Sequence, residues 1–248
     1  MDFLMQSLMR IRPAGCIFCG WPTVEEQQIC RPCSHSLALR LNSERSQVKS
    51  ETHALLPRLR VRYLFRWQPN LDPAVSALVS ALKGGRSRGS WKILAHHFIR
   101  HHGMDLDHLK NIQDLAIVPV PSSKPDRRDH AFHWGEALAG TFQAPFLSPL
   151  RRKSSGNFEQ PQKRLNRQKR VTGRMIFEPA NPSQDPSSPR ACDGSDAHAS
   201  QVVLVDDIIT TGATTKSAAE ALNSIQNEVL EIWTLAYRSR LAQPLQLW

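Results

Sequence analysis

A continuous apolar segment that leads directly into two acids and a threonine-rich loop limits the fold of this chain more than any other feature. The sequence QVVLVDDIITTGATT spans 201–215, and a helical pattern follows from Lys216 to Ile225. An apolar run of this kind is typical of a strand buried on both faces of a parallel sheet. The segment therefore predicts an α/β fold with a doubly wound parallel sheet. Its turn would lie at the carboxyl edge of the sheet, where such folds bind ligands.

The residues of this loop favour a ligand that carries both a phosphate and hydroxyl groups. Gly212 lets the backbone approach a phosphate closely, and the N–H groups at the start of the following helix present partial positive charge. Asp206 and Asp207 are acceptors beside that phosphate, so a ribose phosphate suits the set. Hydroxyl donors come from Thr210, Thr211, Thr214 and Thr215. A Walker A loop is excluded because its G-x-x-x-x-G-K-[ST] order is absent. The alternative is that the acids cap the helix and the threonines fill a turn.

Four of the five cysteines have the spacing of a metal site. They are Cys16, Cys19, Cys30 and Cys33, which form two C-x-x-C pairs joined by a short loop. Each pair can direct two sulfurs at one ion, and thiolates favour zinc over harder cations. With four protein ligands no position is left for a substrate water, so we expect a structural zinc. Two disulfides are the alternative, which a reducing cytoplasm disfavours.

Composition divides the chain into three parts. Residues 1–40 hold the cysteine segment, 41–60 are expected to be a linker, and 61–248 are expected to form the α/β domain. Within that domain, 179–200 has low complexity and is expected to be a mobile insertion. The periodicity predicts strands over 61–67 and 114–121, and helices over 73–82, 90–102 and 131–142. The histidines at 96–97 and 101–102 are expected to be exposed or partly buried. The side chain of Trp134 could either stack on a base or simply pack in the core, and the sequence favours neither alternative.

The net charge of +10 is concentrated in one segment. Nine of the 32 Lys and Arg residues and a single acid lie in 150–174, which gives that segment a charge of +8. Such a concentration indicates an anionic partner, either nucleic acid, a polyphosphate or an acidic protein, unless it is a solvated loop without a ligand. No apolar run approaches the length of a membrane span, and the start, MDFLMQSLMRIRP, does not have the pattern of a secretory signal. We therefore expect a cytoplasmic protein without membrane insertion.

Several motifs together resemble one family. VVLVDDIITTGATT resembles the loop with which type I phosphoribosyltransferases bind 5-phosphoribosyl 1-diphosphate (PRPP). The order of features resembles the ComF/GntX family of competence protein F-like phosphoribosyltransferases. The matching features are the cysteine knuckle, LKGGR at 82–86, VPVP at 118–121, a basic segment with Gln162, Leu165 and Arg170, and the PRPP loop. Where the family usually has R-G-F-N-Q, this chain has HAFHW at 130–134.

The resemblance implies a fold, a ligand and roles for particular residues. It implies binding of PRPP or a ribose 5-phosphate nucleotide, with phosphoribosyl transfer to an unidentified acceptor if the protein is an enzyme. Asp206 and Asp207 would be the catalytic acids, engaging the ribose hydroxyls directly or through Mg²⁺. The 5-phosphate would be held by Thr210, Thr211, Gly212, Ala213 and Thr214, and a mobile arm with Lys163, Arg164 and Arg170 would close over pyrophosphate.

The alternative function is non-catalytic. Members of the resembled family are linked with competence and DNA uptake. A zinc knuckle together with the basic segment 150–174 can hold DNA without sequence preference. On this hypothesis the partners are DNA or competence proteins.

Overall fold

The computed structural model describes nine stretches of the chain. They are residues 15–19, 29–43, 50–53, 56–68, 72–83, 88–121, 129–152, 177–179 and 199–238. The helices are α2 (Arg31–Ser43), α3 (Pro73–Lys83), α4 (Arg88–His102), η2 (Gly103–Leu106), α5 (Asp107–Lys110), α6 (His130–Phe142) and α8 (Ala213–Ser224). The strands are β1 (Ser50–His53), β2 (Leu56–Arg66), β3 (Leu115–Pro119), β4 (Leu150–Arg152), β5 (Phe177–Pro179), β6 (Gln201–Ile209) and β7 (Glu228–Tyr237).

The centre of the fold is a five-stranded sheet with the order β1-β2-β7-β6-β3. The pairs β2–β7, β7–β6 and β6–β3 are parallel, and only β1 is antiparallel to its neighbour. The strands β4 and β5 form a separate antiparallel pair. Asp206 and Asp207 both lie near the carboxyl end of β6, where Asp206 is level with Thr234 near the carboxyl end of the parallel strand β7.

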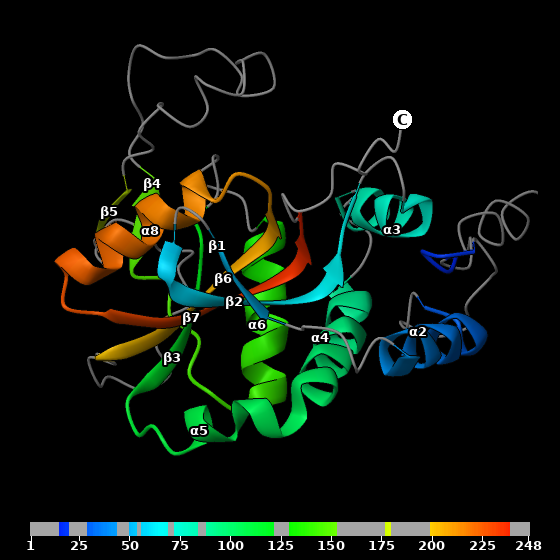
Figure 1. The fold of residues 1–248 in the computed structure, drawn as a ribbon, viewed down its shortest axis with the longest axis horizontal. Coiled ribbons are helices and arrows are strands. Elements are labelled where there is room, and N and C mark those ends of the chain that lie inside the picture. The colour runs from blue at the N-terminus through cyan, green and yellow to red at the C-terminus, as the bar shows by residue number, and fades with distance from the viewer. Residues whose placement is uncertain are drawn as a thin grey trace, which may run out of the picture.

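Helices cover both faces of this sheet, as Figure 1 shows. One face packs against α3, α4 and α6, and the other against α8 together with β4 and β5. Strand β6 alternates between them, because Val203 and Val205 belong to the first core and Val202 and Leu204 to the second. The predicted α/β fold class, with its doubly wound parallel sheet, is therefore confirmed.

The cysteine segment is attached to the first core. Ile29 and Leu37 are buried in it, and the half-buried Ile17 and Phe18 pack against it. The hydroxyl of Ser34 in α2 lies 3.3 Å from Nε2 of His97 in α4, and α2 lies beside α4 in Figure 1. The segment therefore shares apolar packing with the main domain.

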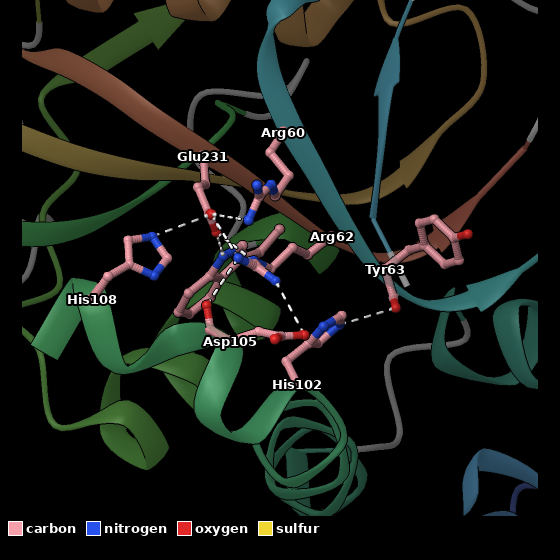
Figure 2. A network of polar contacts seen from close by, with 8 residues as sticks. Arg60, Arg62, Tyr63, His102, Asp105, His108 and Glu231 are labelled. Carbon is pink, nitrogen blue, oxygen red and sulfur yellow. Dashed lines mark hydrogen bonds and ion pairs between the residues drawn. The ribbon is translucent and has the colours of Figure 1, made fainter. Parts of the chain in front are cut away.

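A buried ion pair joins β2 to β7 in the middle of the sheet. The guanidinium of Arg62 donates from Nε to Glu231 Oε2 (2.6 Å) and from Nη2 to Oε1 (2.8 Å). Arg62 Nη2 also donates to the carbonyl of Asp105, and His102 Nε2 donates to the carbonyl of Tyr63 (Figure 2). These bonds tie the end of α4 and the following η2 to β2.

The structure differs from the sequence predictions at three places. Part of the expected linker, 41–60, is β-structure, because β1 and the start of β2 lie there. Three of the four α4 histidines are buried, with His102 only 2% exposed, because the helix turns that side toward the sheet. Trp134 is fully buried against Phe98 and Trp91, so the base-stacking hypothesis is wrong.

The other predicted helices and strands match the structure within a few residues. The exception is β2, which starts at Leu56 and not at the predicted residue 61. Among the described residues, no helix combines the length and the apolar character that a bilayer crossing needs.

Candidate functional site

Gly212 turns strand β6 into helix α8. Its φ is 72°, in the left-handed region that favours glycine, and it occupies the cap position immediately before Ala213. A glycine has no side chain with which to accept a bond from the first-turn N–H groups. The Thr211 hydroxyl lies 3.5 Å from the Ala213 N–H, a weak contact. The loop therefore presents the amino end of a 12-residue helix at the carboxyl edge of the sheet, and Thr210 beside it is exposed.

Asp206 lies beneath this loop and is nearly buried. Its Oδ2 accepts a hydrogen bond from the Thr215 hydroxyl of α8 (3.1 Å), and its Oδ1 accepts from the Asp207 N–H (2.9 Å). Burial raises the pKa of Asp206 well above the usual value for an aspartate, and the nearby Asp207 and Asp129 raise it further. Because both oxygens are engaged and only 9% of the residue is exposed, Asp206 is suited to holding the loop in place.

Asp207 follows Asp206 in β6, and its side chain interacts with that of Asp206. It is half-buried and lines a narrow pocket together with Trp91 of α4 and His130 of α6. The remaining lining residues are apolar: Val79 and Leu82 of α3, Ile208 of β6 and Leu235 of β7. The gap between these side chains is too narrow to admit a water molecule. The backbone at this position is fixed by β7, because the Thr234 hydroxyl donates to the Asp207 carbonyl (3.0 Å).

His130, the first residue of the HAFHW segment, lies beside Asp207, although the sequence did not assign it to the site. It is the first residue of α6, which Asp129 caps by accepting a hydrogen bond from the Phe132 N–H. Its ring lies 6.3 Å from that of Trp91 with a 27° angle between the planes. The available signal was its position, since His130 follows the strand end at Val118–Pro121, as carboxyl-edge residues do in parallel sheets.

The four cysteines come together as predicted. Their sulfurs all lie within 4.8 Å of one another, and all four are free thiols. Burial raises the pKa of Cys16, but hydrogen bonds from the N–H groups of Cys30, Cys19 and Phe18 outweigh it and lower that pKa to about 7. Burial and the neighbouring thiols raise the pKa of Cys33 above its usual value. Four thiols this close favour a metal ion that would take up their negative charge.

The spacing of the sulfurs fits a tetrahedral ion. With zinc–sulfur bonds of about 2.3 Å, adjacent sulfurs of a tetrahedron are about 3.8 Å apart. Cys19 Sγ and Cys30 Sγ are separated by 3.7 Å. The four cysteines therefore form a site that could hold a metal.

Other predicted residues lie outside the described parts of the chain. These are Lys163, Arg164 and Arg170 of the basic segment, the Gly84–Arg86 part of LKGGR, and the low-complexity stretch 179–200 except its ends. Of the segment 150–174, the structure describes Leu150–Arg152. Arg151 there pairs with Glu178 across the β4–β5 ribbon (2.8 Å).

The fold and the site define an α/β protein with two features. At the carboxyl edge of its parallel sheet, Gly212 connects a strand to a helix, and near the amino end four cysteines form a cluster. A segment of 108 residues, 44% of the chain, is 28% identical to competence protein ComFC of Bacillus subtilis (strain 168). That match covers 38% of ComFC, so the chain spans well under half of this relative. No family model matches the chain. The similarity to ComFC supports the ComF-like family resemblance that the motifs carry.

Among solved structures, the chain is similar to adenine phosphoribosyltransferases. The enzyme of Saccharomyces cerevisiae is 17% identical with a TM-score of 0.39, over 82% of this chain and 89% of that one. The enzyme of Leishmania tarentolae is 14% identical with a TM-score of 0.34, over 64% and 74% of the two chains.

Proposed function

We propose that this protein binds PRPP or a ribose 5-phosphate nucleotide at the loop 210–214. The observation that carries the proposal is the glycine-capped start of α8. A helix amino end without a capping side chain provides N–H donors and partial positive charge for a phosphate. The Thr210, Thr211 and Thr214 hydroxyls would add donors, and the motif resemblance points to the same ligand class.

The two acids would have different roles in this proposal. Asp207, which lines the pocket, would meet the ribose hydroxyls directly or through Mg²⁺. Asp206 would hold Thr215 and the Asp207 backbone in position. If phosphoribosyl transfer occurs, the C1–oxygen bond to pyrophosphate breaks and its electron pair leaves with pyrophosphate. The cationic sugar that develops would be stabilised by the adjacent carboxylate.

The cysteine cluster would hold a structural zinc ion in this proposal. What supports zinc is the set of four thiols with tetrahedral spacing, which leaves no position for substrate. Such an ion would stabilise the segment 15–43 against the core, since a segment this small has few apolar residues of its own.

A glycine pair tests the phosphate site. Gly212→Ala places a Cβ at a left-handed φ, whereas Gly140→Ala in α6 is a matched control because an added Cβ there meets no atom within 4 Å. We expect calorimetric titration of PRPP with Mg²⁺ to show binding weakened at least tenfold in Gly212→Ala and unchanged in Gly140→Ala. Equal binding by both variants would count against the loop as the phosphate site.

A nucleic-acid-associated function is the second candidate. The observation in its favour is the charge of +8 in segment 150–174, which no element of the phosphate loop explains. The two functions predict different dependence on salt and on the acids, as developed in the Discussion.

A further inference from the structure

Cys19 and Cys30 form the solvent side of the four-cysteine cluster. Cys19 is exposed and Cys30 is half-buried. Cys16, by contrast, is 3% exposed, and Cys33 packs against the first core. The sulfur of Cys16 also accepts a hydrogen bond from the Cys30 N–H (3.3 Å), which holds it on the inner side. A small oxidant that arrives from solvent would therefore meet Cys19 first.

A bound ion would keep the Cys19 sulfur in its reactive form. A thiol that ligates a metal is deprotonated, and the thiolate is the form that acts as a nucleophile. Oxidation of cysteines in proteins follows thiolate character and exposure. Cys19 would combine the two, because it is a ligand of the proposed metal site and is exposed.

Cys30 is placed to complete a disulfide with Cys19. The two sulfurs are 3.7 Å apart, so a movement of less than about 2 Å would bring them to bonding distance. Ile29 beside Cys30 is 2% exposed, and the Ser34 N–H of α2 donates to the Cys30 carbonyl (2.9 Å). Cys30 is thus anchored by the core and by α2, and the movement would fall on the exposed Cys19.

We propose that this cluster is a site of oxidation by hydroperoxides, at which Cys19 reacts first and then forms a disulfide with Cys30. The inference rests on the metal site of the proposed function and does not involve PRPP. The Cys19 thiolate attacks one peroxide oxygen, the O–O bond breaks, and hydroxide leaves, which oxidises Cys19 to a sulfenic acid. The Cys30 thiolate then attacks the Cys19 sulfur, the S–O bond breaks, and a second hydroxide leaves. Each hydroxide takes a proton from solvent, and the cluster, with two of its four ligands consumed, releases its ion.

The test follows zinc release and disulfide formation together. The full chain, loaded with zinc and carrying Cys192→Ser, is treated with hydrogen peroxide while a chelating dye records free zinc, and peptide mapping identifies the disulfide. We expect zinc release to accompany a Cys19–Cys30 disulfide, and a dithiol with added zinc to reverse both. Cys19→His retains a Cys₃His ligand set and should release zinc about tenfold more slowly. The matched control is Cys33→His, which keeps both thiols of the pair and should respond as the parent does.

The outcomes separate this inference from the metal site on which it rests. A chain that binds no zinc would refute the metal site, and this inference with it. Zinc that stays bound at peroxide concentrations that oxidise free cysteine would refute the inference alone, as would a disulfide between Cys16 and Cys33 or equal rates for Cys19→His and its parent. If a histidine variant takes up no zinc, disulfide mapping in the unaltered cluster still decides the pairing. PRPP binding is titrated separately and bears on neither result.

Discussion

Asp206 and Asp207 are adjacent in sequence and interact through their side chains, yet the surroundings of the two carboxyls differ. Asp206 is nearly buried toward α8, where it accepts a hydrogen bond from Thr215, and Asp207 lines a pocket between α3, α4 and α6. One acid is thus bonded to the first turn of α8, and the other borders the gap beside α3, α4 and α6.

Asp206→Asn is expected to increase stability in a pH-dependent manner. Burial raises the pKa of Asp206 in the folded state above its unfolded value, which is about 3.9. Folding of the wild type therefore becomes less favourable as pH rises from the unfolded pKa to the folded pKa, while the variant has no proton to lose. The stability gain of Asp206→Asn over wild type should be smallest below pH 4 and should grow as pH rises.

Calorimetric unfolding of the wild type and Asp206→Asn between pH 4 and 8 measures this effect. Asp114→Asn, at an exposed aspartate, is the control and should track the wild type. A gain that stays constant or shrinks with increasing pH would contradict the assignment of Asp206 as a buried, destabilised carboxylate.

Loss of the metal is expected to loosen the amino-terminal segment. We expect about one zinc ion per chain, retained in Cys192→Ser and lost in Cys19→Ser, measured by elemental analysis of the purified protein. A chelator should lower the melting temperature by several degrees, because Ile29 and Leu37 would lose their anchored packing. A protein that contains no zinc, or an unchanged melting temperature after zinc removal, would refute this role.

Breaking the Arg62–Glu231 pair is expected to be strongly destabilising. Arg62 is 1% exposed and Glu231 4%, so Glu231→Gln would leave a buried guanidinium with only the exposed carboxylate of Asp105, 4.0 Å away, as its counter-charge. Removing one partner of a buried pair typically costs about 3–5 kcal/mol. Chemical denaturation should show a loss of this order for Glu231→Gln, and for Arg62→Met with Glu231→Leu a loss smaller than the sum of the single variants.

For this pair the exposed Arg60–Glu231 contact provides a control. Arg60 lies 3.9 Å from Glu231 with 56% of its side chain exposed. Arg60→Ala should therefore change stability by less than about 1 kcal/mol. An equal loss for Arg60→Ala and Glu231→Gln would show that burial of the pair is unimportant.

Salt dependence separates the two candidate functions. If segment 150–174 binds duplex DNA through its phosphates, affinity should fall on the order of 10³-fold between 50 and 200 mM salt, without dependence on Asp206 or Asp207. Fluorescence anisotropy with labelled duplex DNA measures this, and added PRPP shows whether the two ligands compete. DNA binding that falls steeply with salt and is retained in the Asp206→Asn/Asp207→Asn variant, in a protein without PRPP affinity, would favour the nucleic-acid function.

The sequence predicted the parts of the fold that depend on local pattern. The apolar run before Asp206, the helix after Pro73 and the spacing of Cys16, Cys19, Cys30 and Cys33 each gave a correct element or cluster. These features depend on periodicity and on turn chemistry, which neighbouring residues determine.

Features that depend on distant partners were not predictable in this way. Arg62 resembles a surface residue of an alternating strand until Glu231, 169 positions away, is placed beside it. The gap lined by Asp207, Trp91 and His130 is formed by β6, α4 and α6, and no spacing in the sequence indicates that these residues meet. The different burial of Asp206 and Asp207 depends on Thr215 of α8 and on the helices packed beside β6, which are distant in the sequence.

The central claim is that Asp206, Asp207 and the loop 210–214 form a PRPP site. Calorimetric titration of PRPP with Mg²⁺ into the zinc-loaded wild type and into the Asp206→Asn/Asp207→Asn double variant tests it most directly. We predict micromolar binding by the wild type and its loss in the double variant, with the Asp207→Asn single variant impaired more than Asp206→Asn. A folded, zinc-loaded wild type that does not bind PRPP would contradict the account.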